Sequence, residues 1–276
     1  MATLPSNDPR YTGPSFGSPS VERDLRRDDE KVLVKEASSG RLTEERRERV
    51  RQKATAEIPW WYSAWGHLAA TTGIGIAVLI VSTVQLLRLG TTHLTDWLVV
   101  PAVFLLANFF EWRVHSHVLH RRAKWIAPFQ VIYDKHTPMH HMIYIEEDMA
   151  LRSTKEFRLV LIPAAGVLGI VLAAAPLAIG IAHLWSASAG WLFLLTASLY
   201  MVTYEVLHLC YHAPSDSFIG RLAFIKVMRA HHAKHHDPRF MQKWNFNVTV
   251  PLFDWLMRTT APKTLPARAP RSTTKA

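Results

Sequence analysis

The stretch LVLIPAAGVLGIVLAAAPLAIGIAHLWSASAGWLFLLTASLYMVTY, residues 159–204, decides the fold because it contains no Asp, Glu, Lys or Arg. A helix on the surface of a soluble protein is usually far shorter and keeps a polar stripe. One crossing of a bilayer needs about 20 apolar residues, so this stretch is long enough for two spans. Residues 183–190, HLWSASAG, form the natural turn between a span at 159–182 and a span at 184–204.

Two more apolar runs precede this pair. Residues 68–87 carry no charge, whereas residues 97–110 form a shorter run that contains Pro101. The shorter run crosses a membrane only if its helix continues past Glu111 into the headgroup region. The four runs predict an all-α integral membrane protein, with four transmembrane helices arranged as two hairpins.

The charges lie outside these runs. The chain has 276 residues, is 49% hydrophobic and 20% charged, and has a formal net charge of +10. Such a charge is typical of nucleic-acid binding or of the basic cytosolic side of a membrane protein. Only one of the 32 Lys and Arg residues, Arg88, falls in a predicted outer loop. The distribution favours the membrane protein, predicts no nucleic-acid partner, and places both termini and residues 113–158 in the cytosol.

Composition predicts three regions along the chain. Residues 1–57 form a charged cytosolic arm, residues 58–262 the membrane domain, and residues 263–276 a basic tail. Residues 1–20 are rich in Pro, Ser and Gly and are predicted to be disordered. The rest of the arm is predicted to be solvated or to touch lipid headgroups, with a short helix capped by Thr43.

Most of the 15 histidines are clustered, and only His67, His93 and His183 are scattered. The others fall in four windows: HSHVLH at 115–120, HTPMHH at 136–141, HLCYH at 208–212 and HHAKHH at 231–236. All four windows lie on the predicted cytosolic side of the membrane. The lone Cys210 excludes an intramolecular disulfide and a cysteine-rich zinc site.

The spacing within the windows predicts two metal ions. Residues four apart share one face of a helix, as in three pairs: His136 and His140, His208 and His212, His232 and His236. The neighbour in each HH pair turns about 100° away and can reach a second ion. His115 and His120 point about 140° apart on an α-helix, so they too could serve two ions.

Ten histidines are too many for one tetrahedral site, which takes about four ligands. We therefore expect a histidine-rich di-metal site in a cytosolic helical cap, with ten ligands: His115, His120, His136, His140, His141, His208, His212, His232, His235 and His236. Imidazole ligands suit zinc, iron, copper or nickel, and no HExxH motif indicates a protease. Ligand type alone does not choose iron over zinc.

The four windows resemble the histidine boxes of the fatty acid hydroxylase / sterol desaturase superfamily. They match as H-x4-H from His115, H-x3-HH from His136, H-x3-H from His208 and H-x2-HH from His232. The tail NFNVTVPLFDWLMRT also resembles the family's closing stretch, and the likeness covers residues 64–260. The second box has three residues before its HH pair where many members have two, and Asn247 stands where Gly is frequent.

The resemblance implies a membrane-bound non-haem di-iron oxygenase that hydroxylates a lipid with O2. The substrate would be an acyl chain of a polar lipid, or a sterol-like or carotenoid lipid. The cofactors would be two iron ions, with zinc possible by substitution. Residues 1–60 contain no His to hold a haem. Electrons would therefore come from a separate carrier of cytochrome b5 or ferredoxin type.

Three carboxylates are candidates for orienting the metal ligands: Glu111, Glu205 and Asp254. Glu111 lies four residues before His115, and Glu205 lies three before His208, so each can share a helix face with a ligand. A carboxylate that accepts the distal N–H of a metal-bound histidine orients it. Asp254 is placed by the family motif, and we expect His117 and His231 to be supporting or incidental.

Two alternatives remain open at this stage. A lipid desaturase would use the same metal site, and a non-catalytic zinc-bound membrane protein would use the same histidines. Product mass separates hydroxylation from desaturation, and oxygen consumption separates both from a zinc scaffold. The small size favours a bacterial inner membrane over the endoplasmic reticulum.

Overall fold

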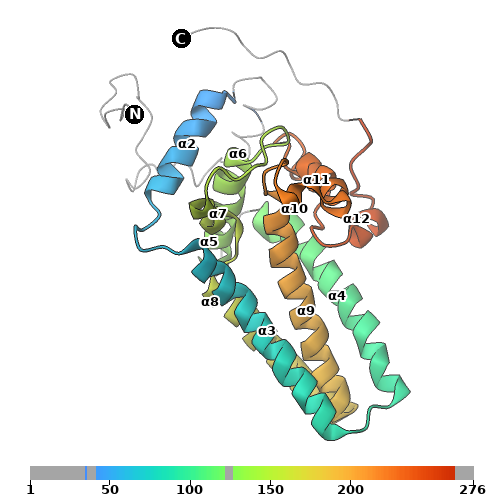
Figure 1. The fold of residues 1–276 in the computed structure, drawn as a ribbon. Helices are drawn as coiled ribbons and strands as arrows, with labels where there is room; N and C mark the ends of the chain where they lie inside the picture. The colour runs from blue at the N-terminus through green and yellow to red at the C-terminus, as the bar shows by residue number, and fades with distance from the viewer. Residues whose placement is uncertain (1–34, 36–41, 122–126, 265–276) are drawn as a thin grey trace.

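The computed structural model describes residue 35 and residues 42–121 and 127–264, and the regular elements within them are helices (Figure 1). A stem of long helices carries a cap of shorter helices at one end. The disorder predicted for residues 1–20 and nearly all of the predicted basic tail lie outside the described residues.

Four segments are long and apolar enough to cross a membrane, which indicates a multi-pass membrane protein. They cover Ala64–Leu89, Leu94–Leu119, Thr154–Leu184 and Ala187–Tyr211. The main helices within them are α3 (Ala64–Leu89), α4 (Val99–Val114), α8 (Ala164–Leu184) and α9 (Ala187–Tyr211). The second segment does continue past Glu111, as its crossing requires.

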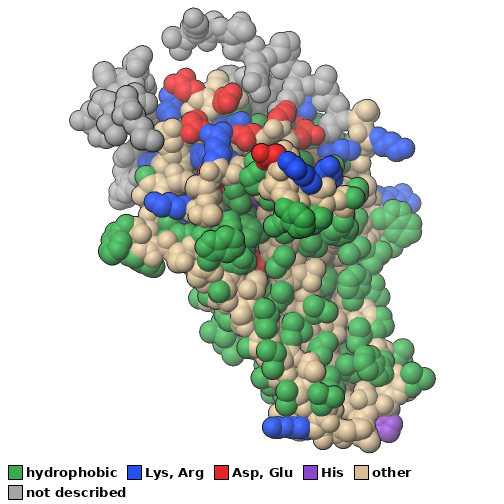
Figure 2. Space-filling view, in the orientation of Figure 1, with side chains coloured by type: hydrophobic (Ala, Val, Ile, Leu, Met, Phe, Trp, Pro, Cys, Tyr) green, Lys and Arg blue, Asp and Glu red, His purple; other side chains and the backbone are tan. Residues whose placement is uncertain are grey.

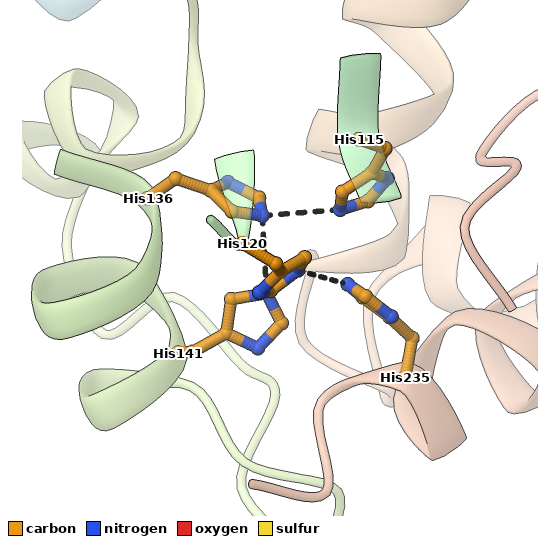
Figure 3. A group of neighbouring side chains, drawn as sticks. All are labelled: His115, His120, His136, His141 and His235. Carbon is orange, nitrogen blue, oxygen red and sulfur yellow. Dashed lines mark hydrogen bonds between the residues drawn. The ribbon is translucent and has the colours of Figure 1, made fainter. Parts of the chain in front are cut away.

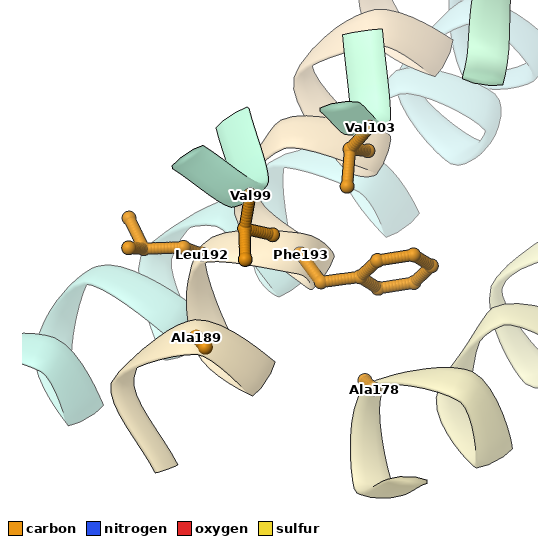
Figure 4. Close-up of a cluster of buried hydrophobic side chains, with 6 residues drawn as sticks. All are labelled: Val99, Val103, Ala178, Ala189, Leu192 and Phe193. Atoms are coloured by element: carbon orange, nitrogen blue, oxygen red, sulfur yellow. The ribbon is translucent and has the colours of Figure 1, made fainter. Parts of the chain in front are cut away.

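Helix α9 is the centre of the stem, because α3, α4 and α8 all pack against it. A buried apolar cluster from α4, α8 and α9 fills the space between them (Figure 4): Val99, Val103, Ala178, Ala189, Leu192 and Phe193. Gly190 allows the close approach of α8, since a Cβ there would lie 2.7 Å from the carbonyl oxygen of Ala178. Exposed apolar side chains cover the outside of the stem (Figure 2).

The second pair of spans differs from the predicted boundaries. The third segment is interrupted at Leu161–Pro163, where Pro163 precedes the first residue of α8 and cannot donate a backbone hydrogen bond. The turn between α8 and α9 contains only Trp185 and Ser186, much shorter than the predicted 183–190. The Ser186 side chain accepts a hydrogen bond from Ala189 N and so begins α9 at once.

The loops at the far end of the stem are joined by side-chain hydrogen bonds. Gly90 ends α3 in the left-handed region, at φ 67°, and the 3-10 turn η1 (Leu94–Leu98) follows. The Ser186 hydroxyl donates to Asp96 Oδ1 at 2.7 Å, and the Ser188 hydroxyl donates to the Thr91 carbonyl oxygen at 3.0 Å. These bonds tie the α8–α9 turn to the α3–α4 connection.

The cap is assembled from segments before, between and after the long helices. Its elements are α2 (Glu44–Ala56), η2 (His115–Leu119), α5 (Ala127–Lys135), η3 (His136–His140), α6 (His141–Ile143), η4 (Thr154–Glu156), α7 (Phe157–Val160), α10 (Phe218–Arg221), α11 (Ala223–His235) and α12 (Leu252–Leu256). Charged side chains gather over the cap, whereas the stem is largely apolar (Figure 2).

Helix α2 corrects the prediction of a solvated arm. The Thr43 side chain caps it by accepting from Arg46 N, which confirms the predicted helix start. The helix nevertheless packs on α6, and its Arg47 and Arg51 are buried. Residues 44–56 therefore belong to the folded unit that carries the histidines.

Candidate metal centre

Two of the histidine boxes lie on π-helical turns. The turn η2 (His115–Leu119) continues α4, and η3 (His136–His140) continues α5. A π-helix has i→i+5 hydrogen bonds, so residues five apart share a face. The His115 and His120 rings accordingly stack, with centroids 5.3 Å apart. Our prediction that they point to different ions is wrong, because it assumed α-helical geometry.

The same geometry changes the pairing in the second box. His136 was expected to share a face with His140, four residues on. On the π-turn it turns instead toward His141, with ring centroids 4.7 Å apart and Nε2 atoms 3.1 Å apart. His140 points to the other side, so the HH pair still divides between two sites as predicted.

The other two boxes are α-helical and follow the expected spacing. His208 lies in the last turn of α9 and His212 at its end, with ring centroids 5.2 Å apart. His232 and His236 on α11 have Nε2 atoms 3.0 Å apart. His235, the neighbour of His236, turns toward His115 and His120 instead.

All ten predicted histidines are brought together in two groups that can each hold a metal ion. Cluster A consists of His115, His120, His136, His141 and His235 (Figure 3). Cluster B consists of His140, His208, His212, His232 and His236. Within each cluster the ligand atoms lie within 4.8 Å of one another. The clusters adjoin, because the rings of His141 and His236 stack with centroids 4.3 Å apart.

Burial keeps these imidazoles neutral. Nine of the ten side chains belong to buried residues, and only His136 is half-buried. Burial, reinforced by repulsion from neighbouring rings, holds the pKa of His120, His212 and His235 well below its usual range. It lowers the pKa of His236 to about 3. A neutral imidazole offers the lone pair that a metal ion needs.

Backbone carbonyls set the direction of the rings. In cluster A, Nδ1 of His115 and His235 can donate to the carbonyl oxygens of Phe246 and Trp244, at 2.5 and 2.8 Å. In cluster B, three rings do the same: His140 to Leu159 at 3.1 Å, His212 to Met149 at 2.8 Å and His236 to Tyr144 at 2.7 Å. A proton fixed on Nδ1 leaves Nε2 free as a ligand atom.

The Nε2 atoms within each cluster are placed as ligands of a metal ion. In cluster A, the Nε2 atoms of His115 and His136 lie 3.0 Å apart, as do those of His120 and His235 (Figure 3). In cluster B, Nε2 of His140, His208 and His212 is buried and has no hydrogen-bond partner among the described residues. Buried polar atoms are rarely left unpaired. A cation in each cluster would satisfy these lone pairs together.

The candidate carboxylates do not contact the ligands in the way we predicted. Glu111 accepts hydrogen bonds from Thr249 N at 3.0 Å and from the Thr249 hydroxyl at 2.6 Å. It also accepts from Val248 N and from the Tyr200 hydroxyl. Glu205 accepts from Ile162 N at 3.1 Å, at the interruption before α8. Both carboxylates hold backbone segments rather than imidazoles.

Asp254 acts on cluster A through one peptide. Its carboxylate accepts from Phe246 N at 2.9 Å and from Asn247 N at 2.8 Å. The carbonyl oxygen of the same Phe246 is the acceptor for His115. His231, outside both clusters, places Nε2 3.3 Å from Asp254, whereas His117 contacts the Ser116 hydroxyl.

Sequence reasoning missed the groups that orient the rings. The acceptors are main-chain carbonyls of loops, which carry no signature in the residue types. Thr137 was also missed: its hydroxyl donates to the Leu119 carbonyl oxygen at 2.6 Å and lies 3.1 Å from Nδ1 of His120. Its position inside the second window, next to His136, was the one available signal.

Comparison with known proteins adds no relative to this picture. No family model, curated protein or solved structure matches the chain.

Proposed function

We propose that this protein is a membrane-bound non-haem di-iron oxygenase that hydroxylates a lipid. The observation that carries the proposal is the pair of adjoining clusters, each with five imidazoles, in the cap of a stem built from apolar helices. The likeness of the four windows to the histidine boxes of the fatty acid hydroxylase / sterol desaturase superfamily supports the same reaction.

Ligand number favours iron over a structural zinc site. Structural zinc is held by four ligands in a closed tetrahedron. Each cluster offers five nitrogen donors and neither contains a thiolate. Two bound iron ions would supply the activation of O2 that attack on an unactivated C–H bond requires. The protein's residues hold the ions, keep the imidazoles neutral and enclose the centre in a buried cap.

A lipid suits the position of the centre. His115 follows α4 directly and His208 lies in the last turn of α9, so the clusters are attached to the ends of membrane spans. An acyl chain, a sterol-like ring or a carotenoid can keep its apolar part in the hydrocarbon while the reacting carbon reaches the cap. An acid or a base cannot activate such a C–H bond. The ten clustered residues are all histidines and include no paired acid and base, which suits metal chemistry better than acid–base catalysis.

The distribution of Lys and Arg orients the protein. We propose that the cap and both termini face the cytosol and that the spans form two hairpins, because the outer loops carry only Arg88. Electrons would reach the site from a separate cytochrome b5-type or ferredoxin-type protein.

Comparative lipid mass spectrometry of a deletion strain and its parent tests the reaction. The parent should contain a lipid one oxygen heavier than the species that accumulates in the deletion strain. Complementation with the wild-type gene should restore it, whereas His208→Ala at equal membrane level should not. A parent-strain lipid that is two hydrogens lighter than the accumulating species would mean that the reaction is desaturation and not hydroxylation.

A zinc-bound scaffold is the second candidate, since the same imidazoles bind zinc. It predicts no oxygen uptake with any reduced carrier and no difference in lipid mass between the two strains. Oxygen consumption that requires both the purified protein and total membrane lipid, with reduced ferredoxin freed of dithionite as donor and the uptake by the donor alone subtracted, distinguishes it from an oxygenase.

A further inference from the structure

We propose that helix α2 positions the ligands of cluster B, and that Arg47 and Arg51 are the residues through which it does so. The proposal rests on the two-metal centre argued above, but not on the identity of the metal or on lipid chemistry. It assigns a role to a segment whose sequence shows only dense mixed charge.

Arg47 joins α2 to the last residue of α6 and to the loop that follows it. Arg47 is only 7% exposed, although α2 is a charged helix at the edge of the cap. Its Nη2 donates to Asp148 Oδ2 at 2.6 Å and to the Ile143 carbonyl oxygen at 3.1 Å. A buried guanidinium is costly unless it is paired, so these contacts hold the helix and the loop together.

Arg51, one turn further along the helix, contacts the same loop. It is 4% exposed, and its Nη2 donates to the Ala150 carbonyl oxygen at 3.2 Å. Its guanidinium lies 5.1 Å from the centre of the Tyr144 ring and 3.9 Å from the Glu156 carboxylate. The Tyr144 hydroxyl donates to that carboxylate at 2.8 Å, so that Arg51, Tyr144 and Glu156 each contact the other two.

The loop between these contacts carries the acceptors for two ligands of cluster B. The Tyr144 carbonyl oxygen accepts from Nδ1 of His236 at 2.7 Å, and the Met149 carbonyl oxygen accepts from Nδ1 of His212 at 2.8 Å. Leu151 N also donates to the His212 carbonyl oxygen at 2.8 Å. The arginines therefore hold the loop, and the loop fixes the direction in which two imidazoles present Nε2.

Cluster A has a further support at the other end of the chain, besides the segment η3–α6 that carries its His136 and His141. Its His115 and His235 rings are held by Phe246 and Trp244, and Asp254 holds the Phe246 peptide. None of these groups contacts α2 through a hydrogen bond recorded among the described residues. Loosening α2 should therefore weaken the ion of cluster B more than the ion of cluster A.

Metal binding by the purified full chain tests this division. The double variant Arg47→Gln/Arg51→Gln should bind one of its two ions about 10- to 100-fold more weakly, as for other changes that disturb the support of a ligand. Competition with a chelator of known affinity measures both ions. The matched control is Arg49→Gln on the same helix, because Arg49 is exposed and its ion pair within the described part of the chain is with Glu45; it should bind both ions as the wild type does.

A second set of variants identifies the affected site. In a His212→Ala background, where cluster B already lacks a ligand, the arginine changes should have little further effect on the remaining ion, whereas Asp254→Asn should weaken the binding of that ion. The milder Arg51→Lys keeps the charge and should show a smaller effect in the same direction.

Wild-type affinity for both ions in the double variant would overturn the proposal. Equal weakening of both ions in Arg51→Gln alone would also overturn it, because the arginines would then support the whole cap. A wild-type chain that binds no metal would instead refute the metal centre itself.

Discussion

Two neighbouring histidines provide the sharpest test of how the fourth box is used. His232 is fully buried in cluster B, where its Nε2 lies 3.0 Å from Nε2 of His236. His231 belongs to neither cluster, and its Nε2 lies 3.3 Å from the Asp254 carboxylate. We predict that His232→Ala loses the cluster B ion and that His231→Ala retains it.

The expected magnitude follows from the number of ligands. A four-ligand structural zinc site is worth about 10–16 kcal/mol, or roughly 2.5–4 kcal/mol for each ligand. Losing one imidazole from cluster B should therefore weaken that ion by about 100-fold or more, since 1.4 kcal/mol is a factor of ten. His231→Ala removes one long contact to a carboxylate that keeps two backbone N–H donors and the Thr259 hydroxyl, so it should cost less than about 1 kcal/mol.

Chelator competition on both purified variants, matched for expression and monodispersity, measures the difference. Equal loss of metal in His231→Ala and His232→Ala would refute the assignment. The face-sharing pair of α11 would then be His231 and His235, and both clusters would have to be redrawn.

Three further predictions concern pH, topology and packing. Below a pH of about 6.5 the unfolded chain binds protons that the fold excludes, because burial lowers the pKa of His236 to about 3 and that of His212 and His232 well below normal. Thermal stability of the metal-free protein should therefore fall as the pH drops from about 6.5 toward 5; stability that rose on acidification would contradict the burial. Reporter fusions after Arg121 and at the C-terminus should both be cytosolic, and opposite locations would refute the proposed orientation. Gly190→Leu should destabilise the α8–α9 contact by about 1–3 kcal/mol in thermal unfolding, whereas Gly180→Leu, with no atom within 4 Å of its Cβ position, should not; equal melting temperatures would contradict that packing.

The membrane spans and the histidine set could be predicted because both depend on residue type and approximate spacing. An uncharged run is visible without knowing the fold, and His232 and His236 share a face on any α-helix. Helix boundaries were less predictable: the turn between α8 and α9 shortens to two residues because Ser186 caps α9 immediately. The hydroxyl of a single serine outweighed the loop-like composition of the surrounding sequence.

The division of ligands between ions could not be predicted for the first two boxes. An α-helix separates His115 from His120 by about 140°, but the π-turn stacks them. Nothing in HSHVLH or HTPMHH marks a π-turn, which is set by how the ends of α4 and α5 meet the rest of the cap. The pairing is thus a tertiary property, although each residue involved was identified.

The support of the ligands was hidden for a related reason. Carboxylates spaced to share a helix face with a histidine were expected to bond to it, as for Glu111 and His115. The chain instead uses loop carbonyls as acceptors and carboxylates to hold the loops. A main-chain carbonyl is present at every residue, so sequence alone cannot say which one meets an imidazole.

The central claim is that clusters A and B each hold one metal ion, and that the ion is iron in the active protein. Metal analysis of the full chain, purified without chelators from iron-replete cells, tests it most directly. We predict two iron ions per chain. Disrupting one cluster should remove one ion, and disrupting both clusters should remove both ions. One ion or fewer per fully folded chain, with all ten histidines intact, would contradict the account.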